Sequence, residues 1–168
     1  LTVAAFTNGA VRVANDRREP FRREVKAEHF AFDGRLLRTD RFTADVAPCT
    51  AAEVGRIAEI PDTFVHLTAG EASNDFFWTD YKACDLADAN VTAVVTEGAD
   101  GTLSVALTTD KPAFFVWGEA HGIRGEFDDN CFTLLPGRPV TLTFTPKGEV
   151  TPDEFREALT VTHLRETY

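Results

Sequence analysis

The chain has 168 residues, enough for one domain or for two small ones. Its composition, 43% hydrophobic and 26% charged residues, is ordinary for a folded protein, and its formal net charge at pH 7 is −10. An acidic chain without a basic stripe repels phosphate backbones, so nucleic-acid binding is not expected. The sequence has no run of about 18 apolar residues, so it predicts no membrane span.

The first half of the chain has a hydrophobic period of two, which is typical of strands. Val11 and Val13 alternate with Arg12 and Ala14, and residues 21–29 alternate in the same way. Asp33-Gly34 is a strong hairpin signal, and 36–46 then reads as the return strand. Further strands are expected at 51–60, 64–68 and 74–79. Because the pattern begins at once, without an initiator Met or a signal peptide, we interpret the chain as a piece of a longer protein.

The polar stretch 81–90 (YKACDLADAN) carries no alternation, and we expect it to be an inter-domain linker. Strands are then expected at 91–96, 102–108, 113–119, 131–135 and 140–145. Pro136-Gly137 is predicted to be a turn that pairs the last two of these strands as a hairpin. Thr151, Pro152 and the acids after them predict a helix over about 152–158. A last strand is expected at 159–164.

Short strands separated by turns every ~8–12 residues predict β-sandwiches. The fold class expected is therefore all-β, with two consecutive β-sandwich domains at 1–82 and 88–168 and one short helix near the C-terminus. Two domains of about 80 residues each fit the length of the chain.

The segment GEFDDNCFTLLPGRPVTLTFTP (125–146) resembles the C-terminal immunoglobulin-like β-sandwich of β-mannosidases in glycoside hydrolase family 2. Phe127, Asp129-Asn130, Phe132 and the run 134–137 carry the likeness, whereas Cys131, Thr133 and Arg138 depart from it. The earlier segments VRVANDRREPFRREV and FDGRLLRTD resemble the immunoglobulin-like domain that precedes it in that family. The resemblance covers nearly the whole chain.

The resemblance implies a non-catalytic role, because the family cleaves its sugar in an upstream TIM barrel. This chain has no βα alternation and no room for a barrel of about 250 residues. The implied function is that of the penultimate and last domains of a β-mannosidase-like exo-glycosidase. The implied partners are the catalytic barrel of the same parent chain and carbohydrate, with no cofactor. A stand-alone carbohydrate-binding or adhesion module remains the alternative, and the location of the parent stays open between a bacterial cytoplasm and export.

Glu126, Asp128, Asp129 and Asn130 form the densest acidic cluster in the sequence. A calcium site would need six to eight oxygen ligands, and the spacing of a calcium loop is absent. Alternate side chains of an extended segment also point to opposite faces. We therefore expect no metal, and interpret Asp128, Asp129 and Asn130, together with Pro136 and Gly137, as residues that shape structural turns.

Trp78 and Trp117 are the two candidate sugar platforms, because an indole face can stack on the apolar face of a pyranose. A place in the core is the competing interpretation for each of them. His121 precedes Gly122 in an expected loop, and is the third candidate for a place near the substrate. No residue is expected to be catalytic, since no serine lies in a G-x-S-x-G motif and no carboxyl pair is evident.

Overall fold

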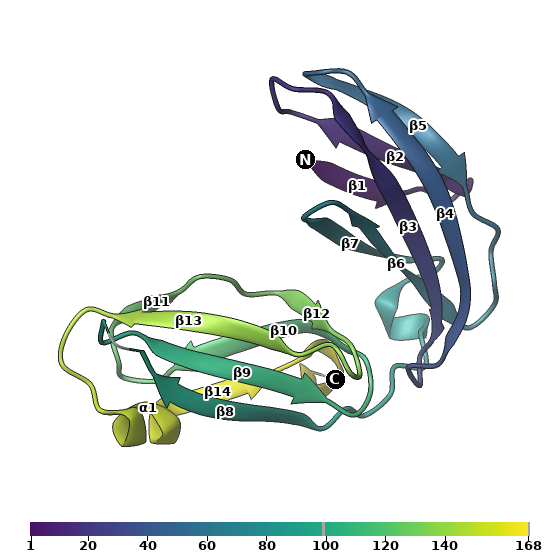
Figure 1. Cartoon of the computed structure of the whole chain (residues 1–168). Coiled ribbons are helices and arrows are strands. Elements are labelled where there is room, and N and C mark those ends of the chain that lie inside the picture. Colours follow the sequence, from purple (N-terminus) through teal and green to yellow (C-terminus); the bar gives the residue numbers. More distant parts are fainter. Residues whose placement is uncertain (99, 168) are drawn as a thin grey trace. The chain divides into compact units, whose positions relative to one another are not determined.

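The computed structural model describes residues 1–98 and 100–167, and the chain forms two compact units, Leu1–Asp85 and Leu86–Tyr168 (Figure 1). The boundary falls inside the stretch 81–90. Nearly all elements are antiparallel strands, so the predicted all-β class is confirmed. No helix of the described part is both long enough and apolar enough to cross a membrane.

The first unit consists of two sheets, one of three strands and one of four. The three-stranded sheet has the order β1-β2-β5, and the four-stranded sheet has the order β4-β3-β6-β7. The strands are β1 (Thr2–Ala5), β2 (Ala10–Asn15), β3 (Phe21–Ala31), β4 (Leu36–Val46), β5 (Thr50–Arg56), β6 (Thr63–Ala69) and β7 (Ala72–Phe77), followed by the 3-10 helix η1 (Tyr81–Ala83).

The hairpin predicted at Asp33-Gly34 is confirmed. It joins β3 to β4, Gly34 has a φ of +95°, and the Asp33 carboxylate accepts a hydrogen bond from the Arg35 N–H at 3.0 Å. The strand predicted at 74–79 lies instead at 72–77. The reason is a tight turn at Gly70, whose φ is +61°, which lets Ala72 pair with Ala69 at once.

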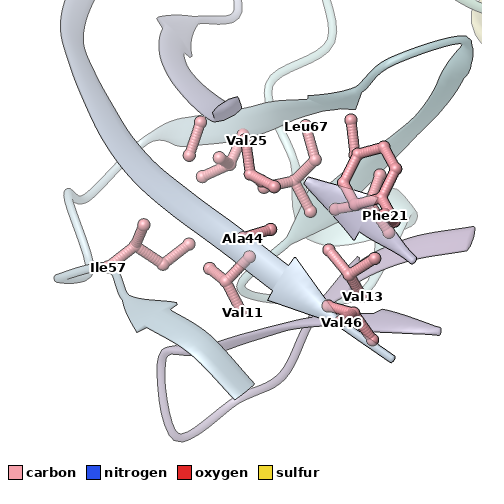
Figure 2. Packing of buried hydrophobic residues seen from close by; sticks show 12 residues of the cluster. Val11, Val13, Phe21, Val25, Ala44, Val46, Ile57 and Leu67 are labelled. Atoms are coloured by element: carbon pink, nitrogen blue, oxygen red, sulfur yellow. The ribbon is translucent and has the colours of Figure 1, made fainter. Parts of the chain in front are cut away.

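The core of the first unit lies where the alternating side chains of the two sheets meet (Figure 2). Val11 and Val13 of β2 are fully buried, as are Val25 of β3 and Leu67 of β6. Burying one such side chain contributes about 1.5–3 kcal/mol. Alternate residues of these strands are therefore the ones that are buried in the core, as the hydrophobic period of two in the sequence predicts.

The second unit also consists of two sheets, with the orders β11-β13-β9-β8 and β12-β10-β14. It contains one α-helix, α1, and a terminal 3-10 helix, η2. The elements are β8 (Val91–Glu97), β9 (Leu103–Thr109), β10 (Ala113–Ala120), β11 (Gly125–Phe127), β12 (Phe132–Leu134), β13 (Val140–Pro146), α1 (Pro152–Ala158), β14 (Leu159–Thr162) and η2 (Leu164–Thr167).

Helix α1 confirms the predicted helix start. The Thr151 hydroxyl accepts a hydrogen bond from the Glu154 N–H, and the Glu154 carboxylate accepts one from the Thr151 N–H, which completes a capping box. The helix buries Phe155 completely, and its ring centroid lies 4.7 Å from that of Phe144 on β13. The last strand ends at Thr162, two residues earlier than predicted, because the backbone of His163 bonds to Glu166 of η2. The His163 N–H donates to the Glu166 carboxylate at 3.0 Å, and its carbonyl accepts from the Glu166 N–H at 3.1 Å.

The predicted hairpin across Pro136-Gly137 is wrong in its pairing. The turn itself is present, since Gly137 has a φ of +72° and the Arg138 N–H donates to the Leu135 carbonyl at 3.0 Å. However, β12 pairs with β10, whereas β13 pairs with β9 and β11. The turn thus carries the chain from one sheet to the other. Both strands contribute buried side chains to one core, so alternation alone could not reveal their partners.

Candidate functional site

The acidic segment 126–131 links β11 in one sheet to β12 in the other. Asp128 is held by β13: its N–H donates to the Thr143 carbonyl at 3.0 Å, and its carboxylate accepts from the Thr143 N–H at 2.8 Å. Asn130 is held by β10: its side-chain oxygen accepts from the Gly118 N–H at 2.7 Å, and its amide donates to the Gly118 carbonyl at 3.2 Å. The side chains of Asp128 and Asn130 therefore bind strands of different sheets, although only one residue separates them in the chain.

The other acids of this segment have separate partners. Asp129 accepts a hydrogen bond from the adjacent Asn130 N–H at 2.8 Å, and Glu126 forms an exposed ion pair with Lys147. The hydrogen bond and charge of Lys147 lower the pKa of Glu126. Across residues 1–98 and 100–167, no group of three or more His, Cys, Asp or Glu side chains is arranged to hold a metal ion. The geometry is that of a corner held by side-chain to backbone hydrogen bonds.

Trp78 follows β7 in the first unit and is half-buried. Its ring meets Phe76 edge to face, with centroids 4.8 Å apart, and packs against the core of that unit. Its indole Nε1 is buried and has no hydrogen-bond partner within the described residues. Trp78 also lines a pocket of about 220 Å³ with Glu59, Asp62 and Cys84, and burial raises the pKa of the Cys84 thiol. The indole is thus engaged in packing on at least one side.

Trp117 lies on β10, the central strand of its sheet, and 46% of it is exposed. A β-bulge precedes it, because Ala113 pairs with Leu134 and Val116 with Phe132, which leaves one extra residue on β10. Phe115 in that bulge has a φ of +51° and is 39% exposed. The strand therefore carries two partly exposed aromatic side chains on its outer side.

His121 lies directly after β10 and continues the outward alternation of Trp117 and Glu119. Its side chain is 59% exposed, and its Nδ1 lies 3.6 Å from a Glu119 carboxylate oxygen. Across the pairing with β14, Trp117 lies opposite Thr162 and Glu119 lies opposite Thr160, and both threonines are exposed. We call this set of Trp117, Glu119, His121, Thr160 and Thr162 the β10 outer row.

The structure brings two of the three predicted substrate-proximal residues, Trp117 and His121, onto this row, whereas Trp78 lies in the other unit. Sequence reasoning missed Glu119, Thr160 and Thr162. The alternation in FFVWGEAH contained the signal for Glu119, but the two threonines depend on the pairing of β10 with β14.

Sequence reasoning also missed a buried polar cluster in the first unit. The His29 side chain is fully buried, and its Nε2 lies 3.0 Å from an Asp40 carboxylate oxygen. The other oxygen of Asp40 accepts two hydrogen bonds from Arg38. Burial lowers the pKa of His29, with Asp40 opposing that shift.

The arrangement of two antiparallel sheets around one core in each unit defines a β-sandwich protein of the immunoglobulin-like class. Residues 86–167, the second unit, match the model of the Ig_mannosidase family, which describes an Ig-fold domain. Over 87 residues the chain is 35% identical to a β-mannosidase from Bos taurus, a match that covers 52% of this chain and 10% of that protein. The predicted resemblance to the immunoglobulin-like domains of β-mannosidase-type family 2 glycoside hydrolases is confirmed.

Solved structures show the same fold over 96% of the chain. A β-D-mannosidase from Dictyoglomus thermophilum superposes with a TM-score of 0.76 at 17% identity, and the match covers 21% of that chain. The exo-chitosanase CsxA from Amycolatopsis orientalis superposes with a TM-score of 0.59 at 18% identity, and the match covers 25% of that chain. The chain therefore spans a quarter or less of the length of these relatives.

Proposed function

We propose that this chain forms the non-catalytic accessory domains of a β-mannosidase-like exo-glycosidase, with the hydrolysis of terminal β-mannosides carried out by a TIM barrel elsewhere in the parent. The observation that carries the proposal is the match of residues 86–167 to a mannosidase Ig-fold domain, in a chain that covers 10% of its bovine β-mannosidase relative. In this proposal the two units are the penultimate and last domains of the parent, and the barrel is their partner.

The chemistry of the described carboxylates supports a non-catalytic role. A retaining glycosidase needs two carboxyl groups about 5–5.5 Å apart, and the group that acts as an acid needs a raised pKa. Glu126 has its pKa lowered by Lys147, and Asp128 is engaged with the Thr143 backbone. A barrel of about 250 residues would also exceed the length of this chain.

An aryl β-mannoside assay on the purified chain tests the proposal, with a full-length β-mannosidase as the positive control. We expect release of the aryl group at the rate of the buffer alone, because the reacting carboxyl pair belongs to the barrel. Turnover above that rate, lost on substitution of a carboxylate in this chain, would overturn the proposal. A reading frame that encodes the two sandwiches alone would favour the alternative of a stand-alone binding module.

A further inference from the structure

We propose that the β10 outer row is a carbohydrate-binding surface on which the Trp117 indole stacks against the apolar face of a neutral pyranose. Trp117 lies on the central strand of its sheet, where it pairs with Thr162 of β14, yet 46% of the residue is exposed. An indole presented in this way offers an apolar face without further movement of the backbone.

The neighbours of Trp117 include polar side chains that can hydrogen-bond to the hydroxyl groups of a sugar stacked on the indole. Thr162 lies directly opposite Trp117, and Glu119 and Thr160 form the next outward pair along the same two strands. Directly paired residues of antiparallel strands lie about 4.5–5.5 Å apart at Cβ, so these groups border the indole. Two hydroxyls and a carboxylate can then hydrogen-bond to the hydroxyls at the rim of a pyranose.

The β-bulge is an independent observation that points to a ligand. A non-glycine residue with positive φ, such as Phe115, costs of the order of 1–3 kcal/mol, and such residues cluster at binding sites. Phe115 and Trp117 lie two residues apart and are both exposed, whereas the extra residue leaves the consecutive Ala113 and Phe114 both buried. Bulges of this kind re-aim side chains, and they are over-represented next to active sites.

The size of the aromatic patch favours a sugar over a protein partner. A stable protein interface buries about 800 Å² on each partner, whereas one Trp buries only about 150–250 Å² in total. The row is bordered by polar side chains at Glu119, His121, Thr160 and Thr162. The Glu119 carboxylate and the net charge of −10 disfavour acidic sugars, and the ligand that we propose is a neutral pyranoside. The narrower choice of a β-mannoside rests on the proposed function.

NMR titration of the whole chain tests the surface, because the chain has only two tryptophans and their indole N–H signals can be assigned by substitution. β-1,4-Mannobiose, cellobiose and glucuronic acid serve as probes, and glycerol is the control for bulk hydroxyls. We expect the Trp117 signal to shift saturably with mannobiose, and the Trp78 signal to stay in place. Trp117→Ala should weaken binding at least about tenfold, and Thr162→Val by a few-fold.

Val94→Ala is the matched control, because Val94 is 57% exposed on β8 in the opposite sheet of the same unit. It should bind as the wild type does. The proposal would be overturned by no saturable shift, by an equal shift with glycerol, or by unchanged affinity in a folded Trp117→Ala variant. Saturable binding of cellobiose without mannobiose would overturn the β-mannoside assignment but would leave the surface established. The proposed function would still rest on the match of residues 86–167 to a mannosidase Ig-fold domain.

Discussion

Asn130 and Gly118 exchange two hydrogen bonds, in which the Asn130 side chain accepts from the Gly118 N–H at 2.7 Å and donates to the Gly118 carbonyl at 3.2 Å. Gly118 is buried on β10, whereas Asn130 belongs to the corner that arrives from the other sheet. The Asn130 side chain therefore makes the two hydrogen bonds to Gly118 that a neighbouring strand would otherwise make, at a point where the backbone of the corner does not pair with β10. The corner depends on the amide for both hydrogen bonds.

The substitution Asn130→Ala should destabilise the second unit by about 1–3 kcal/mol, because it leaves a buried N–H and a carbonyl without their partners. For a unit of this size that corresponds to a fall in melting temperature of roughly 4–8 °C per kcal/mol. Asp129→Ala should lower the melting temperature less, since Asp129 bonds only to the adjacent Asn130 N–H. Thermal unfolding followed by circular dichroism measures both. An Asp129→Ala effect as large as that of Asn130→Ala would contradict this account of the corner.

Stability should fall as the pH drops from 7 to 5, with His29 as a contributor. Burial lowers the pKa of His29 in the folded state, so below about pH 6.5 the unfolded chain binds the proton more readily than the folded chain does. The contribution of His29 to the free energy of unfolding is complete above pH 6.5, and it is lost as the pH falls through the lower pKa that His29 has in the folded state. Urea unfolding of wild type and His29→Gln at several pH values should give a smaller loss for the variant.

The control for this measurement is Leu37→Gln, because Leu37 is exposed on β4 of the same unit and neither side chain titrates. It should keep the pH dependence of the wild type. The same slope against pH for wild type and His29→Gln would show that His29 does not contribute.

Gly125→Ala should destabilise the second unit through overpacking. A Cβ at Gly125 would lie 2.2 Å from the Phe144 ring and 2.7 Å from the Thr145 carbonyl oxygen, and a strained core of this kind costs about 1–3 kcal/mol. Gly148→Ala is the matched control, since a Cβ there meets nothing within 4 Å. It should be neutral or slightly stabilising in thermal unfolding. Equal melting temperatures for the two variants would mean that β11 can shift to make room.

Trypsin should cut the folded chain first after Lys82, which is exposed in η1 near the C-terminal end of the first unit. Mass spectrometry should then find two fragments that resist further digestion, because each unit has its own core. Lys82→Gln should slow that first cut. Initial cleavage after Arg23 or Arg41, which lie inside strands β3 and β4, would argue against the proposed domains 1–82 and 88–168.

The sequence by itself determined the features that depend on a few neighbouring residues. Asp33-Gly34 produced its hairpin because the residues of a tight turn set its backbone angles locally. The Thr151 capping box produced α1 because its partners lie three residues apart. The period of two located the strands and the core valines, since successive side chains of a strand point to opposite faces.

Only the tertiary structure decided which strands pair and which polar groups are buried. β12 and β13 share a core without sharing a sheet, and the alternation of both strands is the same for either pairing. The burial of His29 and the meeting of Trp117 with Thr162 likewise depend on residues distant in the chain. The physical reason is that alternation specifies the face a side chain occupies, whereas its neighbours on that face follow from the long-range register of hydrogen-bonded strands.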